Sequence, residues 1–415
     1  MIFFLIDFFR EVLGFKVPLA FEHYSTRMML AVITSVVISI FLGPRFIKKL
    51  YELKIGQPIR MEECPLLGQL HEKKKDTPTM GGALILFSML TSMFLWMDFQ
   101  NVFTLILLFV SVTLGLLGAY DDYLKLKYKN AKGLSGRKKL LIQGTVSGLV
   151  ALYLLCPPVT EAIHIGKWFQ PPVVKENVRN NLSSANAESR NSTVSTTQKI
   201  VPLKEFASRI YIPFFKEPVV TFSGIFVILA GLFIMCVITG SSNGANLTDG
   251  LDGLAAGCLI MVAGCLALIA FISNNVDLAG YLNILYIEGS GEIAIYLSAL
   301  VGACIGFLWY NSHPAQVFMG DTGSLALGGI IGVSSVLLGR EFLLALIGGI
   351  FVAETFSVIL QVGSYKFRNK KRIFLCSPLH HHFEYKGWPE TKIVIRFWIV
   401  GLLLAIAGVA SLKIQ

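Results

Sequence analysis

The sequence predicts an all-α, polytopic integral membrane protein that forms a single domain over residues 1–415. Apolar residues make up 54% of the chain and charged residues only 15%, and the mean hydropathy is +0.65. A soluble domain has about 25% charged residues. About ten stretches approach the roughly 20 residues that an α-helix needs to cross a hydrocarbon core. Membrane spans therefore account for the apolar content.

The predicted spans follow one another along most of the chain. They lie near 28–44, 80–97, 102–120, 139–156, 219–239, 251–272, 293–310, 322–338, 342–363 and 393–412. Short cytoplasmic connections collect Lys and Arg. Such residues gather after the first, third and ninth predicted spans. This pattern places those connections in the cytoplasm and both termini outside.

The formal net charge of +10 follows from the same topology and from attraction to anionic membrane lipid. Nucleic acid is therefore not an expected partner. The seven cysteines contain no CxxC pair and mostly fall inside predicted spans. They are interpreted as small core hydrophobes rather than as disulfides or metal ligands.

An external loop is predicted over 157–218. Its segment 177–199 is rich in Asn, Ser and Thr, so it cannot bury enough apolar surface to offset the entropy of ordering it. We predict a mobile insertion there. The flanking segments 163–174 and 200–215 alternate loosely between apolar and polar residues, which indicates a short external β-hairpin.

Aspartates recur where the predicted spans end. Asp121 and Asp122 close the third span, Asp249 and Asp252 precede the sixth, and Asp321 precedes the eighth. Each alone fits helix capping or a charged helix end. Because the topology brings all of them to one membrane face, they can instead hold Mg²⁺ beside a phosphate. The chain is then interpreted as an enzyme that acts on a lipid.

Groups suited to phosphate also occur at the starts of predicted spans. They are Lys74, Thr79, Asn246, Gly320 and Ser324. If Leu251 opens a helix, Asp249 lies near its N-cap, where free backbone N–H groups favour anions. Glycine permits close approach of backbone to phosphate. For Lys74, a membrane anchor that follows the positive-inside rule is the alternative interpretation.

Two further sets of polar residues lie in the last cytoplasmic loop and on the ninth predicted span. His380, His381 and His382 are consecutive, so they cannot all point one way, and a zinc site built from them alone is geometrically poor. Hydrogen bonding to phosphate or carboxylates fits better. Glu354 and Gln361 are seven residues apart on one helix face, where interhelical hydrogen bonds are the default and substrate lining is the alternative.

Five strings carry a resemblance when they are taken in order. They are KDTPTMGG (75–82), GAYDDYLK (118–125), NLTDGLDGLA (246–255), HPAQVFMGDTGSL (313–325) and PLHHHFE (378–384). From about Tyr24 to the C-terminus the chain resembles the phospho-N-acetylmuramoyl-pentapeptide transferases. These belong to the polyprenyl-phosphate N-acetylhexosamine-1-phosphate transferase superfamily.

The resemblance implies transfer of phospho-MurNAc-pentapeptide from UDP-MurNAc-pentapeptide to undecaprenyl phosphate at the cytoplasmic face, giving lipid I and UMP with Mg²⁺. It implies that Asp321 ligates the metal, that Asp121 and Asp122 act at the lipid phosphate, and that the three histidines join the active site. The expected substrate-binding residues are Lys74, Thr79, Arg137, Lys139, Asn246, Asp249, Asp252, Asn311, Phe318, Gly320, Ser324 and Gln361. Phe318 is expected to stack on uracil.

Several alternatives stay open. A sister enzyme that transfers GlcNAc-1-phosphate would share the aspartates, and an ion-coupled transporter would also hold carboxylates in a membrane. Direct displacement by the lipid phosphate competes with a covalent aspartyl intermediate. The oligomeric state is open, with a homodimer as one alternative. The chain also departs from the resembled pattern, because Asp76 stands where glycine is usual and the 177–199 insertion is long.

Overall fold

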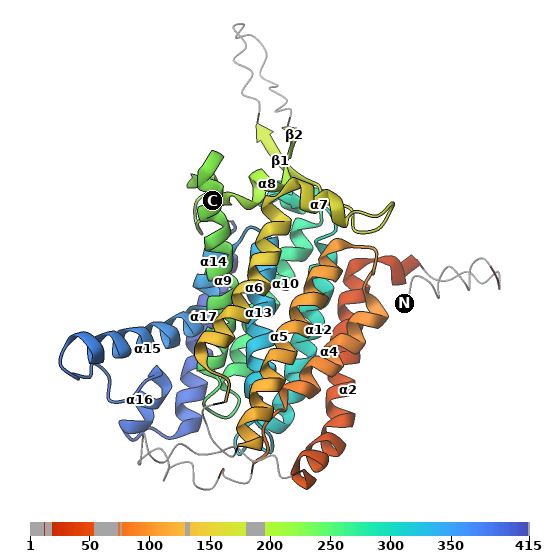
Figure 1. The fold of residues 1–415 in the computed structure, drawn as a ribbon. Helices are drawn as coiled ribbons and strands as arrows, with labels where there is room; N and C mark the ends of the chain where they lie inside the picture. The colour runs from red at the N-terminus through yellow and green to blue at the C-terminus, as the bar shows by residue number, and fades with distance from the viewer. Residues whose placement is uncertain are drawn as a thin grey trace, which may run out of the picture.

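The computed structural model describes residues 12, 19–53, 74, 77–128, 133–179 and 196–413, and these form a bundle of helices (Figure 1). Eight helices within these ranges are long and apolar enough to cross a membrane. They are α2 (Tyr24–Glu52), α5 (Val102–Lys127), α6 (Gly136–Leu155), α9 (Val227–Thr248), α10 (Leu254–Ser273), α12 (Gly291–Asn311), α13 (Gly320–Leu337) and α17 (Glu390–Ser411). A shorter apolar helix, α4 (Gly82–Trp96), and a bent helix pair complete the predicted set. The polytopic all-α fold is confirmed.

Small residues let the central helices pack closely. Helix α13 packs against both α5 and α9, and 89% of its residues are buried. A Cβ atom on Gly328 of α13 would lie 2.7 Å from Cβ of Ala245 on α9. Small side chains of this kind are how membrane helices approach one another. The first turn of α13, which carries Asp321, is therefore fixed between α5 and α9.

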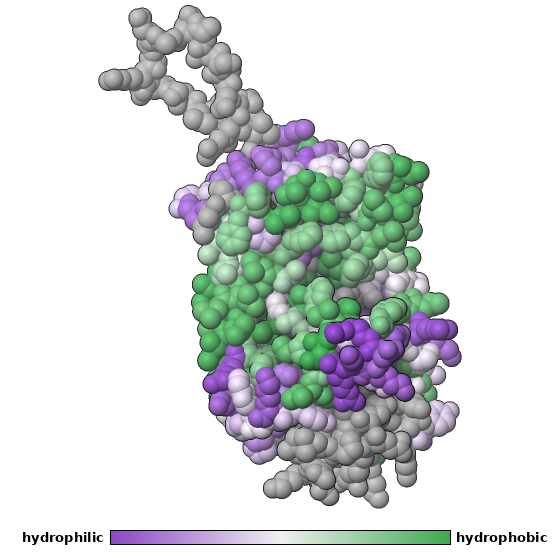
Figure 2. All heavy atoms as spheres, turned by 90° about the vertical axis from the view of Figure 1, so that its left-hand side faces the viewer, coloured by the Kyte–Doolittle hydropathy of each residue, from purple (hydrophilic) through white to green (hydrophobic). Residues whose placement is uncertain are grey.

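The outer surface of the bundle is apolar. On α2, the buried residues Ala31, Ser35, Ser39 and Gly43 recur every four positions, whereas Met29 and Phe41 on the opposite face are 65% and 71% exposed. A soluble helix shows the reverse arrangement. Figure 2 shows an apolar band that continues across one side of the molecule, with hydrophilic atoms beyond it at both ends. This surface matches the hydrocarbon core of a bilayer.

The ninth predicted span, 342–363, is broken rather than continuous. Helices α14 (Glu341–Ile347) and α15 (Gly349–Phe367) meet at an angle of 86°, and α15 projects sideways from the bundle (Figure 1). The break falls at Gly348 and Gly349, where a Cβ on Gly349 would lie 2.8 Å from Leu404. Two adjacent glycines weaken a helix. Hydropathy alone does not detect such a bend.

The external hairpin exists, but its strands differ from the prediction. Strand β1 (Val174–Arg179) pairs antiparallel with β2 (Thr196–Val201), and β1 also pairs with β5 (Tyr286–Ile287). The strands therefore include both ends of the predicted insertion, and its middle, 180–195, lies outside the described residues. Smaller elements complete this end of the fold: α7 (Pro157–Ile163), α8 (Leu203–Ala207), β3 (Arg209–Ile210), β4 (Val220–Thr221), α11 (Val276–Tyr281) and the 3₁₀ helices η1 (Leu19–Glu22) and η3 (Gly224–Phe226).

Candidate active site

The ends of α5 and α13 meet through a glycine and an aspartate. A Cβ atom on Gly118 of α5 would lie 2.5 Å from the carbonyl carbon of Asp321 and 2.6 Å from Cα of Thr322. One turn later, Asp122 accepts hydrogen bonds from the backbone N–H of Asp321 at 3.2 Å and of Thr322 at 2.9 Å. The Thr322 hydroxyl donates to it as well, at 2.7 Å. Asp122 thus caps α13 from a different helix.

The third predicted span was expected to end at Tyr120, but α5 continues to Lys127. Asp121 and Asp122 therefore lie inside the helix rather than beyond its end. This extension matters because it places Lys125 one turn after the two carboxylates. Residues four apart on a helix share a face. The structure thus adds a lysine that the sequence reasoning did not select, although Lys125 is the last residue of the GAYDDYLK string.

Two lysines from different helices bind the carboxylates. The Lys125 ammonium lies 2.8 Å from Asp121 Oδ2 and 3.0 Å from Asp321 Oδ1. Lys139, on the first turn of α6, lies 2.9 Å from Asp121 Oδ2 and 2.6 Å from Asp321 Oδ2. Asp121, Asp122 and Asp321 each offer an oxygen within 4.8 Å of the others. Two cations thus face three carboxylates, which leaves an excess of negative charge.

Exposure separates the three carboxylates. The Asp321 side chain is 13% exposed, whereas Asp121 and Asp122 are 0% and 3% exposed. Asn246, near the end of α9, donates to Asp321 Oδ1 at 3.0 Å and to the Ser324 hydroxyl at 2.8 Å. Carboxylate oxygens with residual negative charge suit a hard divalent cation. The donor set fits such an ion, with Asp321 as the most accessible ligand.

Asp249 lies at the C-cap of α9, not at the start of the next helix as predicted. Helix α10 begins only at Leu254, because Gly253 turns the chain with φ of +78°, a conformation that suits glycine. Burial and the charges of Asp321 and Asp122 raise the pKa of Asp249 to about 7, although the backbone N–H of Gly320 donates to it. Its proton is therefore sensitive to charge at the carboxylate cluster.

The segment that begins α4 lies along the segment that begins α13. The carbonyl of Pro78 accepts from the backbone N–H of Phe318, and Gly81 donates to the carbonyl of Phe318, both at 2.8 Å. A Cβ atom on Gly320 would lie 2.7 Å from the Thr79 hydroxyl, and Gly320 has φ of +73°. Thr79 and Gly320 are thus brought beside the capping carboxylate of Asp122.

A second polar cluster lies around Asp252. The Lys74 ammonium is 2.6 Å from Asp252 Oδ1 and 2.6 Å from Glu390 Oε1, at the start of α17. His313 Nδ1 is 3.0 Å from Asp252 Oδ2. Asn311 holds the same loop through the backbone N–H of Gly253, at 3.0 Å. Glu390 and His313 were not selected from the sequence. His313 begins the HPAQVFMGDTGSL string, whereas Glu390 belongs to none of the motif strings.

The aromatic ring of Phe318 borders this second cluster. The Lys74 ammonium lies 5.9 Å from the ring centroid, and the Phe318 side chain is partly exposed. A partly exposed ring beside a cation and carboxylates can accept a flat polar ligand on its face. Arg137, in contrast, lies exposed on the first turn of α6, two residues before Lys139.

The three histidines belong to a short helix, α16 (Leu379–Tyr385), and point to different partners. Glu354 of α15 accepts from the backbone N–H of Leu379 at 2.6 Å and of His380 at 3.1 Å, which fixes the start of α16. His380 is buried, and a Cβ atom on Gly250 would lie 2.9 Å from its Cε1. The histidine run is thus joined to the Asp249–Asp252 loop through His380.

The other two histidines, His381 and His382, form hydrogen bonds within α16 and the loop before it. His381 Nδ1 lies 2.6 Å from Glu384 Oε2, and His382 Nδ1 accepts from the backbone N–H of Leu375 at 3.1 Å. Gln361, expected to bind substrate, bonds instead to the loop before α16. Its Oε1 accepts from the backbone N–H of Phe374 at 2.9 Å, and its Nε2 donates to the Phe374 carbonyl at 3.0 Å.

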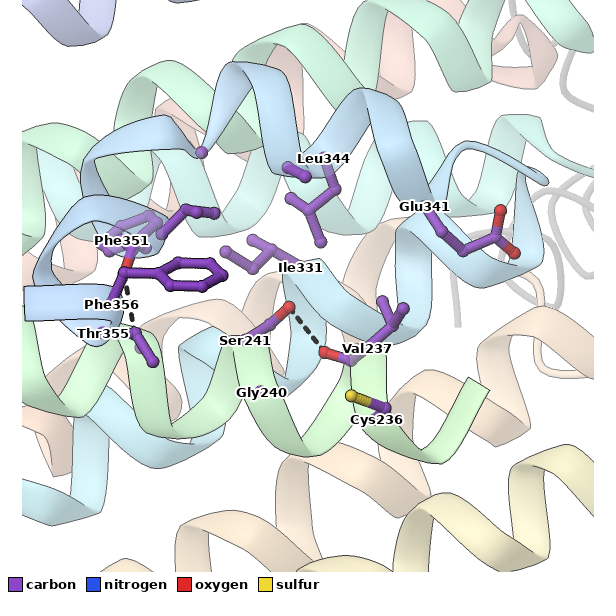
Figure 3. A pocket seen from close by; sticks show the side chains of 14 residues that line it. Cys236, Val237, Gly240, Ser241, Ile331, Glu341, Leu344, Phe351, Thr355 and Phe356 are labelled. Atoms are coloured by element: carbon purple, nitrogen blue, oxygen red, sulfur yellow. Dashed lines mark hydrogen bonds between the residues drawn. The ribbon is translucent and has the colours of Figure 1, made fainter. Parts of the chain in front are cut away.

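An apolar cavity of about 190 Å³ lies beside α9. Its lining comes from α9, α13, α14 and α15 and comprises Cys236, Val237, Gly240, Ser241, Gly244, Ile331, Glu341, Leu344, Ala345, Gly348, Phe351, Val352, Thr355 and Phe356. Figure 3 shows Phe351 and Phe356 at one end and Glu341 at the other. Gly244 is two residues before Asn246, so the aromatic end lies nearer to Asp321.

Comparison with known proteins gives full-length matches. The chain is 68% identical over 415 residues, and 100% of both chains, to a phospho-N-acetylmuramoyl-pentapeptide-transferase of Protochlamydia amoebophila (strain UWE25). The chain belongs to the phospho-N-acetylmuramoyl-pentapeptide-transferase family. A transferase of that name from Desulfotalea psychrophila (strain LSv54 / DSM 12343) is 40% identical over 402 residues, covering 97% of this chain and 96% of its own.

A model of glycosyl transferase family 4 matches residues 193–339. This match includes Asn246, Asp252 and Asp321, whereas Asp121 and the histidine run lie outside it. Membership of the phospho-N-acetylmuramoyl-pentapeptide-transferase family makes the chain a transferase and a multi-pass membrane protein, as the motif strings predicted.

Proposed function

We propose that this chain transfers phospho-MurNAc-pentapeptide from UDP-MurNAc-pentapeptide to undecaprenyl phosphate, giving lipid I and UMP, at the cytoplasmic face of the bacterial inner membrane. The observation that carries the proposal is the meeting of Asp121, Asp122 and Asp321 with Lys125 and Lys139, which brings three carboxylates and two ammonium groups together from α5, α6 and α13. A lipid phosphate and a nucleotide diphosphate can reach such a place from the membrane and from water, respectively.

The reaction is a single displacement. A phosphate oxygen of the lipid forms a bond to the phosphorus that carries the sugar, and the bond from that phosphorus to the UMP oxygen breaks. Positioning and charge stabilisation are what a protein can contribute to such a step. The ammonium groups of Lys125 and Lys139 would offset charge on the diphosphate, and Asp121, which contacts both, would hold them in place.

Magnesium is the ion that we propose for the carboxylate cluster, with Asp321 as its main ligand and Asn246 beside it. When bound, Mg²⁺ would neutralise charge that develops on the phosphate oxygens. Asp122 would act through position, because its oxygens cap α13 and so set where Asp321 stands. The carboxylates themselves would not attack the substrate, so a covalent aspartyl adduct is not expected when the lipid acceptor is left out.

The nucleotide and the prenyl tail would bind in different surroundings. The uracil ring would stack on Phe318, next to Lys74 and the carboxylate of Asp252, and Asn311 would support the loop that carries Asp252. His380 would approach the substrate from the other side of the Asp249–Asp252 loop. The prenyl tail would enter the cavity between α9 and α15, where apolar side chains replace lipid, and its phosphate would lie toward Asn246.

The deciding experiment is release of UMP by the purified enzyme. UDP-MurNAc-pentapeptide and UDP-GlcNAc are compared at equal concentration, with undecaprenyl phosphate and Mg²⁺ present. We expect UMP from the muramoyl substrate and a rate at least about 10²-fold lower with UDP-GlcNAc, because contacts to the missing groups are lost. A preference for UDP-GlcNAc would assign the chain to the sister transferases. If neither substrate gave UMP, both assignments would be refuted.

Metal binding should depend on pH because of Asp249. Its raised pKa of about 7 keeps the carboxyl largely neutral at pH 6 and ionised at pH 8. A nearby divalent cation favours the ionised form, so Mg²⁺ binding should release a proton at pH 6. The apparent affinity should therefore rise between pH 6 and pH 8, by up to about tenfold per unit below the pKa.

Isothermal titration calorimetry in buffers of different ionisation enthalpy measures both the Mg²⁺ affinity and the number of protons released on binding. The variant Asp249→Asn cannot ionise and serves as the control. We expect it to bind Mg²⁺ with little pH dependence over the same range. Equal pH slopes for the wild type and Asp249→Asn would contradict the assignment of the proton to Asp249.

A further inference from the structure

We propose that the turn between α15 and α16 forms a binding site for the headgroups of anionic lipids. This basic turn comprises Arg368, Lys370, Lys371 and Arg372, and Lys366 on the last turn of α15 adds to it. All five side chains are exposed. Within the described part of the chain, the ion pairs that the structure contains include none of these five. Their charges are therefore free to meet a ligand.

Backbone and side-chain contacts fix the shape of the basic turn. Gln361 accepts from the backbone N–H groups of Ile373 and Phe374 at 3.0 and 2.9 Å. The Ser364 hydroxyl donates to the carbonyl of Lys371 at 2.9 Å. Lys370 N–H donates to the carbonyl of Tyr365 at 3.1 Å. The backbone groups of a solvated loop can bond to water, so the hydrogen bonds from the buried Gln361 and Ser364 serve as a clamp that holds the turn in one shape.

The backbone at the tip of the turn is in a conformation that side chains rarely adopt. Asn369 and Lys370 have φ values of 49° and 63°. Asn tolerates this left-handed region, but Lys does so at a cost. The conformation places consecutive basic side chains on one tight turn. The hydrogen bonds from Gln361 and Ser364 already order the backbone of the turn, so a ligand would not have to offset the entropy of ordering it.

The position of the turn selects a lipid over a soluble anion. Helix α15 leaves the bundle sideways, and its outer residues Phe356 and Ile359 are 56% and 57% exposed, as expected for contact with lipid (Figure 1). Beside the cations, Phe367 is 88% and Leu375 49% exposed. Figure 2 shows hydrophilic atoms directly below the apolar band on the side of the molecule from which α15 projects. Cations next to exposed apolar side chains match a bilayer surface.

One consequence concerns the cavity. Phe351, Val352, Thr355 and Phe356, which line it, belong to the same helix as the basic turn. Anionic headgroups held at the end of α15 would fix this helix in the bilayer and raise the local concentration of anionic lipid near the cavity. The binding itself does not depend on the proposed reaction, so it can be measured without substrates.

The test counts lipids bound to the purified full-length protein by native mass spectrometry. The detergent-solubilised protein is titrated with phosphatidylglycerol and, separately, with phosphatidylcholine. The variant K370Q/K371Q/R372Q removes three charges from the basic turn. The matched control R45Q/K48Q/K49Q removes three exposed charges from the end of α2. We expect the first variant to lose at least about tenfold in apparent affinity for phosphatidylglycerol, because its three charges share one clamped turn. The control should lose less than about twofold, because its three charges lie on a helix and not on such a turn.

A second variant tests the clamp. Gln361→Ala keeps every charge but releases the turn, and we expect an intermediate loss of phosphatidylglycerol binding with an unchanged response to phosphatidylcholine. Equal losses in the two triple variants, or no loss in either, would overturn the proposal. So would full displacement of the lipid by inorganic phosphate at millimolar concentration, because the surface would then be a site for a soluble anion.

Discussion

The variant Asp321→Asn should release UMP at least about 10³-fold more slowly than the wild type, with little change in stability. Asp321 is the most exposed of the three clustered carboxylates, and it contacts both Lys125 and Lys139. Loss of its charge removes the main proposed metal ligand and frees the two ammonium groups. Loss of one preorganised electrostatic contact costs about 10² to 10³ in rate, and here two kinds of contact are lost together.

The rate is measured as UMP released under saturating UDP-MurNAc-pentapeptide. The matched control is Asp277→Asn, an exposed carboxylate on the short helix α11, which should keep the wild-type rate. A Mg²⁺ titration distinguishes the cause, because the Asp321 variant should also require more metal for half-maximal residual activity. Residual activity within about tenfold of the wild type would exclude Asp321 as the main metal ligand, given the expected magnitude.

The variant Gly118→Ala should damage the site through the addition of a single methyl group. The added Cβ would lie 2.5 Å from the carbonyl carbon of Asp321 and 2.6 Å from Cα of Thr322. Both contacts are with backbone, which cannot rotate away as a side chain can. The first turn of α13 must shift, and overpacking of this kind costs about 1–3 kcal/mol. A misplacement of about 1 Å at the reacting groups can cost about 10²-fold in rate.

We therefore expect Gly118→Ala to lower the rate of UMP release by about 10²-fold while every carboxylate and lysine of the site is still present. Thermal unfolding in detergent, followed by circular dichroism, gives the accompanying loss of stability. Gly264→Ala on α10 is the control, since a Cβ there meets nothing within 4 Å, and alanine also favours helix over glycine. Activity of Gly118→Ala equal to that of Gly264→Ala would show that α13 can move without consequence for the reaction.

Most of the fold was predictable because bilayer physics acts on local sequence. Apolar runs of sufficient length predicted the spans, and eight long apolar helices, one short one and a bent pair occupy the predicted regions. The bend at Gly348 was missed because hydropathy averages over a window and does not register which way a helix turns. The strands at 174–179 and 196–201 were misplaced because loose alternation of apolar and polar residues defines no register.

The site was predictable to a different extent. The motif strings identified most of the residues that the structure brings together, including Asp122, Asn246 and Asp321. Their partners were less visible, since Glu390 lies 138 positions from Asp252, whose backbone N–H donates to it. For Gln361 the substrate role stays a prediction. Its place on a helix face left substrate lining as the alternative to hydrogen bonding, and in the structure its hydrogen bonds hold a loop.

The sequence by itself determined that the chain is a polytopic helical membrane protein, that aspartates gather at one of its faces, and that its motifs are those of a transferase family. These features depend on composition, spacing and order, which a linear chain displays. Only the tertiary structure decided that Asp122 caps a neighbouring helix, that Lys125 and Lys139 stand between carboxylates, and that α15 leaves the bundle. Such relations depend on distances between atoms far apart in the chain, and close packing between helices fixes those distances.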